Sequence, residues 1–255
     1  MRREIIVKGL HIDNQQPMIC IPVINKDMQE IVTEAQSLVE HGVSMVEWRA
    51  DYFESLQDTS AVLAVLEQLS QVCKQCILLV TIRSKKQGGH GVQSQQELQQ
   101  LLLAIAASHY ADMIDVEFFE AKQPNKLIRE LKKEGIIVIC SHHDFQETPS
   151  IHVMNMLLEQ MAEGGADIVK LAVMPQEVSD VLDLLKVTND FYEEYEEIPV
   201  ITMSMGKLGM ISRISGEVFG SCVTFGTLGE SSAPGQLPMG ELQQALEFMH
   251  HNYVE

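Results

Sequence analysis

A lysine lies inside an apolar run of this sequence. Residues 167–175 read Asp-Ile-Val-Lys-Leu-Ala-Val-Met-Pro, a pattern that predicts a short buried strand ended by a proline. A buried ammonium group is costly unless it is paired or loses its proton. Lys170 therefore has two interpretations: a strand-edge side chain that extends its amine to water, or a desolvated amine that attacks a carbonyl carbon.

Two histidines end another apolar run, in Ser141-His142-His143-Asp144-Phe145. Alternation along a strand directs the two imidazoles to opposite faces. An amine that forms an imine with a ketone needs a proton shuttle, and imidazole serves that purpose near neutral pH. A histidine that only satisfies a hydrogen bond is the alternative, and alternation does not choose between His142 and His143.

Acids and arginines follow further predicted strands. The acids that share a parity within their strand are Glu47 with Asp51 and Asp115 with Glu117. The arginines at or near strand ends are Arg49, Arg83 and Arg213. Each arginine either binds a substrate carboxylate or belongs to a structural ion-pair network, and spacing leaves both interpretations open.

The elements that must position these residues alternate in type. The predicted strands are 18–23, 44–49, 76–82, 112–117, 136–141, 168–173, 199–203 and 221–225. Helical patterns occupy 26–41, 60–75, 94–108, 125–134, 150–164, 176–195, 207–215 and 239–252, and residues 4–13 predict a small hairpin. This α/β order predicts a (β/α)8 barrel with its active site at the carboxyl ends of the strands. A doubly wound open sheet is the alternative, but no glycine-rich nucleotide loop follows the first strand.

Composition narrows the function. The net charge is −18, with 36 acids against 18 Lys and Arg, which argues against nucleic acid or an anionic membrane as a partner. The five scattered cysteines do not suggest a disulfide framework, and we expect no functional role for the Cys73–Cys76 pair. No linker divides residues 1–255, so we expect one barrel domain. The sequence shows no apolar leader and no apolar run of 18 residues, so we expect a cytoplasmic protein. No histidine pair has metal-ligand spacing, and we expect neither a metal nor a cofactor.

Several motifs resemble, in order and over nearly the whole chain, those of type I 3-dehydroquinate dehydratases. They are Glu47-Trp48-Arg49-Ala50-Asp51, Ser141-His142-His143-Asp144-Phe145, Asp167-Ile168-Val169-Lys170, Met203-Ser204-Met205-Gly206, Ser212-Arg213, Thr224-Phe225-Gly226 and Ser232-Ala233-Pro234-Gly235-Gln236. The resemblance implies a barrel closed at its bottom by the N-terminal hairpin. It implies a lyase that converts 3-dehydroquinate to 3-dehydroshikimate and water, the third step of the shikimate pathway, by syn elimination through a lysine Schiff base. It also implies a cytoplasmic homodimer.

The resemblance also assigns roles to single residues. Lys170 matches the Schiff-base lysine, His143 the acid/base histidine, and Arg213 the residue that binds the substrate carboxylate. Residues that match those holding the hydroxyls or closing a lid are Glu47, Arg49, Arg83, Ser232 and Gln236, and those that match apolar walls are Met203, Met205 and Phe225. The glycine-rich segment 225–236 is then a lid that excludes water.

One position departs from the family pattern. The family has Glu-Gly-Gly after the third strand, with the acid beside the catalytic histidine, whereas this chain has Gln87-Gly88-Gly89. An amide hydrogen-bonds an imidazole but does not stabilise an imidazolium by charge. We therefore expect a lower pKa for His143 than an acid at position 87 would give.

Two other functions stay open: a Schiff-base aldolase acting on another carbonyl compound, and a barrel that has lost its chemistry.

Overall fold

Strands and helices alternate along the chain, as the sequence predicts. The computed structural model describes residues 4–229 and 232–253. The strands of the main sheet are β3 (Met18–Val23), β4 (Met45–Arg49), β5 (Ile77–Thr81), β6 (Met113–Glu117), β7 (Ile137–Asp144), β8 (Ile168–Val173), β9 (Val200–Ser204), β10 (Val223–Thr227) and β11 (Leu237–Pro238). The helices are α1 (Met28–Glu40), α2 (Thr59–Val72), α3 (Gln95–Ser108), α4 (Pro124–Lys133), α5 (Ile151–Glu163), α6 (Val178–Glu194), α7 (Met210–Ile214), α8 (Gly216–Phe219) and α9 (Met239–Tyr253).

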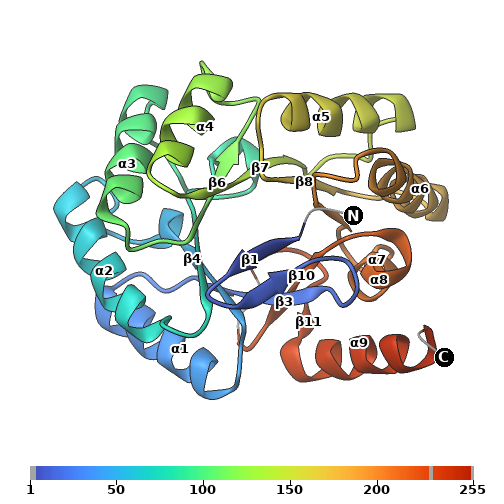
Figure 1. The fold of residues 1–255 in the computed structure, drawn as a ribbon, viewed down its shortest axis with the longest axis horizontal. Helices are drawn as coiled ribbons and strands as arrows, with labels where there is room; N and C mark the ends of the chain where they lie inside the picture. The colour runs from blue at the N-terminus through green and yellow to red at the C-terminus, as the bar shows by residue number, and fades with distance from the viewer. Residues whose placement is uncertain (1–3, 230–231, 254–255) are drawn as a thin grey trace.

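The strands curl into a (β/α)8 barrel. From β3 to β9 each strand pairs in parallel with the next one in the chain, and β10 returns to pair with β3. Between β9 and β10 a parallel bridge joins Val200 to Ser221, and the Cys222 N–H donates to the Val200 carbonyl at 2.9 Å. Helices surround the strands as a ring in Figure 1. The predicted barrel is therefore confirmed.

Alternation along the strands divides the apolar residues into two cores. In β8, Ile168 and Ala172 belong to the cluster inside the barrel, while Val169 and Leu171 belong to the cluster between strands and helices. Because both faces of the sheet are covered, the strands are apolar on both faces, as parallel sheets usually are. A polar residue on the inward parity, such as Lys170, then needs partners inside the barrel.

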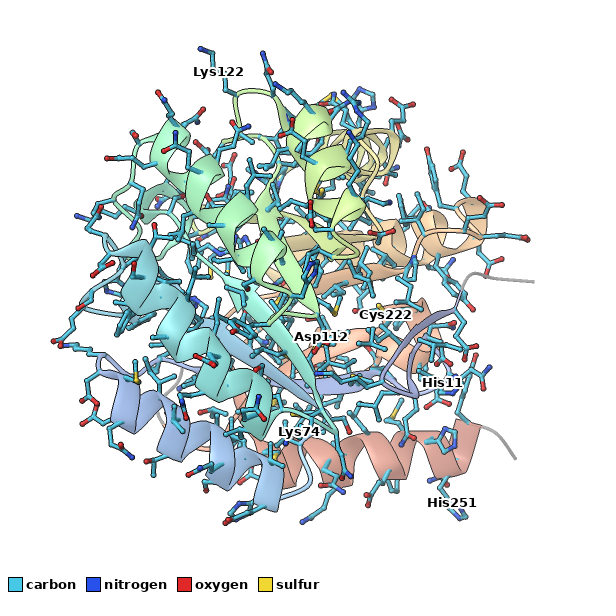
Figure 2. All side chains as sticks on the ribbon, turned by 60° about the vertical axis from the view of Figure 1, so that its left-hand side comes forward. His11, Lys74, Asp112, Lys122, Cys222 and His251 are labelled. Atoms are coloured by element: carbon cyan, nitrogen blue, oxygen red, sulfur yellow. The ribbon has the colours of Figure 1, made fainter. Side chains whose placement is uncertain are left out.

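The N-terminal hairpin lies across the end of the barrel where the strands begin. It consists of β1 (Ile5–Val7) and β2 (Leu10–Ile12), and its buried Ile5 and Ile12 join the interior cluster. Lys8 donates to the Cys73 carbonyl at 2.7 Å and to Asp112 at 2.6 Å, both just before a strand. Figure 1 shows β1 over the centre of the ring, and Figure 2 shows Lys122 projecting outward. The hairpin therefore closes the bottom and leaves the opposite end for a site.

A few boundaries differ from the predicted ones. Strand β7 continues to Asp144 because His142 and His143 pair with Leu171 and Ala172 of β8. The helix predicted over 207–215 is instead two short helices, α7 and α8, with Ser215 between them. The short strand β11, which pairs with β10, was not predicted. Within the described ranges, no helix has the length and apolar character needed to cross a bilayer.

Candidate active site

A small pocket lies at the carboxyl ends of the strands, the end where barrels carry their active sites. It is lined by the residues to which the resemblance assigns a role and by Gln87, namely Glu47, Arg49, Arg83, Gln87, His143, Lys170, Met203, Met205, Arg213, Phe225, Ser232 and Gln236, together with Gly88, Phe145, Ala172 and Ala233. Its volume is about 40 Å³, far below the roughly 300 Å³ at which small-molecule sites begin. The pocket is therefore narrow in this structure.

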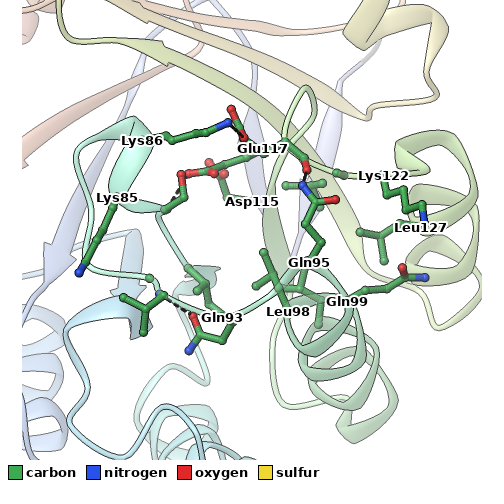
Figure 3. Close-up of a pocket in the computed structure, with 18 of the residues that line it drawn as sticks. Lys85, Lys86, Gln93, Gln95, Leu98, Gln99, Asp115, Glu117, Lys122 and Leu127 are labelled. Carbon is green, nitrogen blue, oxygen red and sulfur yellow. Dashed lines mark hydrogen bonds and ion pairs between the residues drawn. The ribbon is translucent and has the colours of Figure 1, made fainter.

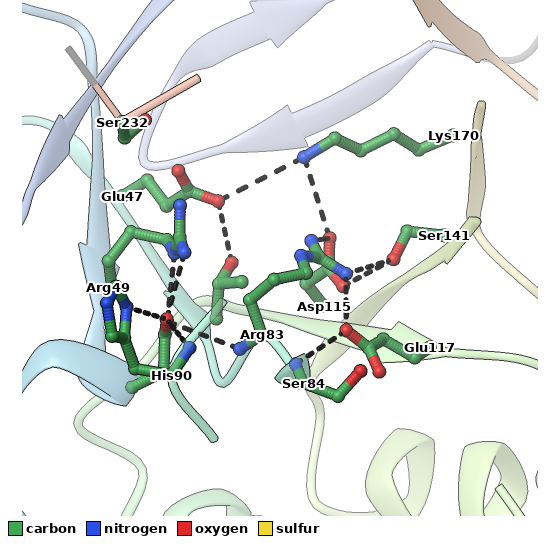
Figure 4. A network of polar contacts seen from close by, with 12 residues as sticks. Glu47, Arg49, Arg83, Ser84, His90, Asp115, Glu117, Ser141, Lys170 and Ser232 are labelled. Atoms are coloured by element: carbon green, nitrogen blue, oxygen red, sulfur yellow. Dashed lines mark hydrogen bonds and ion pairs between the residues drawn. The ribbon is translucent and has the colours of Figure 1, made fainter. Parts of the chain in front are cut away.

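Lys170 points into this pocket from the middle of β8. It is 3% exposed, so the strand-edge interpretation is wrong. Its Nζ lies 3.6 Å from Asp115, 4.0 Å from Glu47 and 4.1 Å from the centroid of the Phe225 ring. Figure 4 shows the amine directed at the two carboxylates. Lys170 is thus a buried amine held by charge and by an aromatic face.

The acids and arginines of β4 to β7 form what we call the paired network, which consists of Arg49, Asp51, Arg83, Asp115, Glu117 and Ser141 (Figure 4). Arg49 donates two hydrogen bonds of 2.9 Å to Asp51. Arg83 donates to Asp115 at 2.9 Å, to Glu117 at 3.2 Å and to Ser141 at 2.9 Å. Ion pairing is therefore shown for both arginines.

Electrostatics inside the paired network favour the ionised forms. Burial alone opposes the charge on Arg83, but Asp115 and Glu117 outweigh it and raise the pKa of Arg83. Burial likewise opposes the charge on Asp115, yet Arg83 and Lys170 lower the pKa of Asp115 below its ordinary value. The network is thus a set of fixed, mutually compensated charges.

Arg213 is surrounded differently. It comes from α7, is 2% exposed, and donates from one NH2 group to the Pro234 carbonyl at 2.9 Å. Its Nε and its other terminal nitrogen have no hydrogen-bond partner within the described residues. Burial lowers the pKa of Arg213 to about 10. A buried guanidinium with free donors is suited to accept a planar anion such as a carboxylate.

The segment 232–236, which we call the lid segment, covers the pocket beside Arg213. The Ser232 N–H donates to Gln236 Oε1 at 2.9 Å, and Gln236 Nε2 donates to the Ser232 hydroxyl at 3.0 Å. Gly235 adopts a φ of +77°, and a Cβ there would lie 2.4 Å from the Gly206 carbonyl. Only glycine fits this close approach. Residues 230–231 of the predicted lid lie outside the described residues.

Gln87 positions His143. Its Oε1 accepts from the His143 backbone N–H at 2.9 Å and lies 3.1 Å from His143 Nδ1. Because the backbone group is a donor, the side-chain oxygen and not the NH2 group faces His143. The same oxygen then requires a proton on Nδ1, which leaves Nε2 with a free lone pair. This tautomer is that of a general base acting through Nε2.

The glycine pair after Gln87 makes this contact feasible. Gly88 has a φ of +77°, and a Cβ at Gly89 would lie 2.2 Å from the Arg83 carbonyl. The chain therefore folds back tightly enough to place Gln87 against β7 only because these positions lack side chains. Burial and the nearby cations Arg83 and Lys170 lower the pKa of His143 well below its ordinary value. The imidazole is neutral near pH 7.

His142 faces away from the pocket, toward the helices. Its ring meets the Phe119 ring edge to face, with centroids 5.4 Å apart. Burial lowers the pKa of His142. The expectation that one histidine points inward and the other outward is confirmed, and the inward one is His143.

No catalytic or binding role was predicted for Asp115, although it is among the carboxylates nearest to Lys170. Two signals could have identified it: its parity with Glu117, and its place on a strand beside the one that ends in the histidines. Within the described part of the chain, no group of three or more His, Cys, Asp or Glu residues could hold a metal ion. The buried amine of Lys170, the neutral imidazole of His143 and the unused donors of Arg213 are suited to covalent acid–base chemistry on an anionic carbonyl compound.

Comparisons with known proteins identify the family of this chain. The family model described as Type I 3-dehydroquinase matches residues 19–253. A 3-dehydroquinate dehydratase of Klebsiella pneumoniae is 39% identical over 98% of this chain and 100% of its own, and one of Enterococcus faecalis is 39% identical over 98% and 99%.

Solved structures show the same fold. The 3-dehydroquinate dehydratase of Geobacillus kaustophilus superposes with a TM-score of 0.95 at 34% identity and covers 100% of both chains. The type I enzyme of Clostridium difficile, solved with covalently modified comenic acid, has a TM-score of 0.95 at 38% identity over 99% of this chain and 100% of its own. The chain is therefore an enzyme of the type I 3-dehydroquinase family.

Proposed function

We propose that this enzyme removes water from 3-dehydroquinate to give 3-dehydroshikimate, the third step of the shikimate pathway, by syn elimination through a Schiff base on Lys170. The observation that carries the proposal is that one narrow pocket is lined by both a buried amine and a histidine whose Nε2 keeps its lone pair. The covalently modified ligand in the related Clostridium difficile structure is consistent with covalent chemistry in this family.

Imine formation starts the reaction. The Lys170 amine, as the free base, attacks the ketone carbon, and the carbinolamine loses its hydroxyl as water to leave an iminium. The positive charge acidifies the C–H bond at the neighbouring carbon, C2, which is otherwise too weak an acid for a base at neutral pH. Asp115 and Glu47, at 3.6 Å and 4.0 Å from Nζ, are placed to stabilise that charge.

His143 carries the protons. Its neutral imidazole first assists proton transfers while the imine forms, and then takes the C2 proton through Nε2. It returns a proton to the C1 hydroxyl, which leaves as water on the same face of the ring. Water then hydrolyses the product iminium and releases 3-dehydroshikimate and the Lys170 amine. A single group on one face predicts syn elimination. General acid–base catalysis of this kind contributes about 10²–10⁴-fold in rate.

The remaining residues hold the substrate. Arg213 has free donors for the substrate carboxylate, and the lid segment with Ser232 and Gln236 lies next to it. Closing that segment excludes water from the imine. Residues proposed to position the hydroxyls are Glu47, Arg49 and Arg83, with Met203, Met205 and Phe225 as apolar walls.

The cellular setting is also part of the proposal. We infer a cytoplasmic enzyme that is one barrel domain over 1–255, in keeping with the free, buried cysteines of the described residues. We further infer a homodimer. Val178 and Leu182 of α6 are 63% and 61% exposed, and an interface would bury these apolar side chains. Light scattering coupled to gel filtration would give about twice the 28.6 kDa mass of one chain.

An assay on purified protein tests the function directly. We expect the enone absorbance of the product to rise when 3-dehydroquinate is added. A class I aldolase would leave this substrate unchanged and cleave another carbonyl compound, and a barrel without chemistry would give no absorbance change. No product at saturating substrate would refute the proposed function.

A further inference from the structure

The chain turns sharply after β5, over residues 83–90, which we call the Gln87 loop. This loop includes the 3-10 helix η2 (Lys85–Gln87) and carries the oxygen that faces His143. Gln87 Oε1 accepts from the His143 N–H and lies opposite Nδ1. The proton on Nδ1 therefore depends on where this loop lies relative to β7.

Hydrogen bonds within and just beyond the loop fix its shape. The Gly89 N–H donates to the Ser84 carbonyl at 2.9 Å, and the Gly91 N–H donates to the Arg83 carbonyl at 2.8 Å. These bonds join the two ends of the turn to each other. They do not attach the turn to its neighbours, so its position must come from contacts with the rest of the barrel.

Contacts on the side of β6 attach the first half of the loop. Lys86 pairs with Glu120 at 2.9 Å, but the lysine is exposed, and exposed pairs contribute little to stability. The Ser84 N–H donates to Glu117 at 2.8 Å. Figure 3 shows Lys86 on the side of the loop that faces Glu117. Neither contact reaches the far end of the loop, at His90.

Asp51 attaches the loop at both ends. It lies in the 3-10 helix η1 (Ala50–Tyr52), which follows β4. Its Oδ1 accepts from the Arg83 N–H at 3.2 Å, and its Oδ2 accepts from the His90 N–H at 3.1 Å. The Asp51 side chain is fully buried, and Asp51 is not one of the described residues that line the active-site pocket. Hydrogen bonds from backbone N–H groups to an ionised carboxylate are stronger than those to a neutral acceptor.

Arg49 fixes the direction of that carboxylate. It donates to both oxygens of Asp51, each at 2.9 Å, so two oxygens receive four hydrogen bonds. Figure 4 shows Arg49, Arg83 and His90 around this group. The Tyr52 ring also lies against the His90 ring, with centroids 4.3 Å apart. The turn after β4 thus holds the far end of the Gln87 loop through two neighbouring side chains.

We propose that Asp51 is a positioning residue, which clamps both ends of the Gln87 loop and thereby keeps the proton of His143 on Nδ1. The inference rests on the proposed role of His143 as the base that acts through Nε2. Asp51 acts through Gln87 and has no contact with the substrate.

Asp51→Asn tests the clamp. It replaces one acceptor oxygen by an NH2 group, which cannot accept from the N–H that it faces, so one end of the loop is released. Nitrogen NMR of labelled histidine reports the result, because ring nitrogens with and without a proton give widely separated signals. At a pH where the ring is neutral, we expect two well-separated His143 signals in the unaltered protein, and signals that approach each other in the variant. Unchanged His143 signals in Asp51→Asn would overturn the proposal.

Asp58 provides a matched control. Its carboxylate also accepts from two backbone N–H groups, those of Ser60 and Ala61 at the start of α2. Asp58→Asn should therefore leave the His143 signals unchanged. The NMR readout requires no turnover, so failure of the proposed function would appear in the product assay, while the His143 signals would still decide the role of Asp51.

Kinetics tests whether Asp51 acts through Gln87. Asp51→Asn should lower kcat about 10²-fold, because a small displacement of a catalytic group is costly. Gln87→Ala removes the oxygen itself, so adding Asp51→Asn to that variant should lower kcat by less than about threefold further. An unchanged kcat in the single variant, or losses that multiply in full in the double variant, would overturn the proposal.

Amide hydrogen exchange tests the clamp in the unaltered protein and requires no variant to fold. The His90 side chain is exposed, yet its N–H donates to a buried carboxylate. We therefore expect this amide to exchange at least about 10²-fold more slowly than in an unstructured peptide. Exchange at the unstructured rate would overturn the clamp.

Discussion

Arg83 and Arg213 are both buried arginines at the mouth of one barrel, yet their surroundings are opposite. Arg83 donates to two carboxylates and a hydroxyl, whereas Arg213 donates to one backbone carbonyl and keeps two nitrogens free within the described residues. Accordingly, the pKa of Arg83 is raised and the pKa of Arg213 is lowered to about 10. The difference separates an arginine whose charge is used by the fold from one whose charge is left for a ligand.

The two arginines also come from different kinds of segment. Arg83 follows β5 inside a network drawn from neighbouring strands, which sheet pairing holds in place. Arg213 lies in a five-residue helix next to the lid segment. We call Arg83 with its carboxylates the paired side of the pocket, and Arg213 with the lid segment its open side. Both arginines line the pocket together with Lys170. This arrangement suits a site that must admit its substrate and then exclude water.

Removing the Lys170 amine should have the largest effect on activity. Lys170→Ala eliminates the covalent route, so we expect kcat to fall by more than about 10⁴-fold, beyond the range of a lost acid–base group. Steady-state kinetics on 3-dehydroquinate measures it. Lys207→Ala, which removes an exposed lysine, serves as the control and should keep full activity. A Lys170→Ala enzyme with a kcat within tenfold of the original would refute the covalent mechanism.

On the paired side, the Arg83→Met variant should unfold more easily than the unaltered enzyme. Asp115 and Glu117 would remain as buried charges without their partner, so we expect the free energy of unfolding to fall by about 3–5 kcal/mol. Chemical denaturation gives this value. Lys86→Met removes a cation from an exposed pair with Glu120 and should change stability by less than about 1 kcal/mol. Similar losses in both variants would contradict the structural role of Arg83.

On the open side, Arg213→Met should act on binding and not on stability. We expect KM to rise about 10–100-fold, since a charge-assisted bond to the substrate carboxylate is lost. The free energy of unfolding should stay level or rise slightly, because a buried cation without a carboxylate is removed. An unchanged KM together with a large loss of stability would place Arg213 with Arg83 and abolish the distinction between the two sides.

Position 87 should produce the smallest effect. The pKa of His143 in the folded enzyme lies below the usual 6.5. Because the neutral form of His143 is the active one, kcat/KM is lost as the pH falls through that pKa. In Gln87→Glu a carboxylate stabilises the imidazolium and raises that pKa, so the acidic limb of the kcat/KM profile should move up by about one pH unit. The pH–rate profiles of the two enzymes measure the shift. Superimposable profiles would show that the amide does not set the pKa.

Much of the fold followed from the sequence because the period of the apolar residues changed clearly between strands and helices. Lys170 and the pair His142-His143 were identified because they interrupt or end an apolar strand, and the family resemblance then selected His143. Strand pairing places Lys170 and His143 on the same face. The roles of Arg83 and Arg213 were not separable from spacing. Each follows its own element, and only the folded structure shows which arginine has carboxylates within reach.

The tautomer of His143 was also beyond the sequence. It depends on one oxygen of Gln87 meeting both a backbone N–H and an imidazole nitrogen, a contact made by the tight turn at Gly88 and Gly89. The unpredicted strand β11 has two residues, too few to show a periodic pattern.

Borohydride trapping tests the central claim most directly. Borohydride reduces an iminium to a stable secondary amine, so treatment in the presence of 3-dehydroquinate should inactivate the enzyme and attach one ligand-derived mass to each chain. Peptide mass spectrometry should locate that mass on Lys170, and omission of the substrate should leave both mass and activity unchanged. An enzyme that turns over 3-dehydroquinate yet carries no adduct on Lys170 after this treatment would contradict the account.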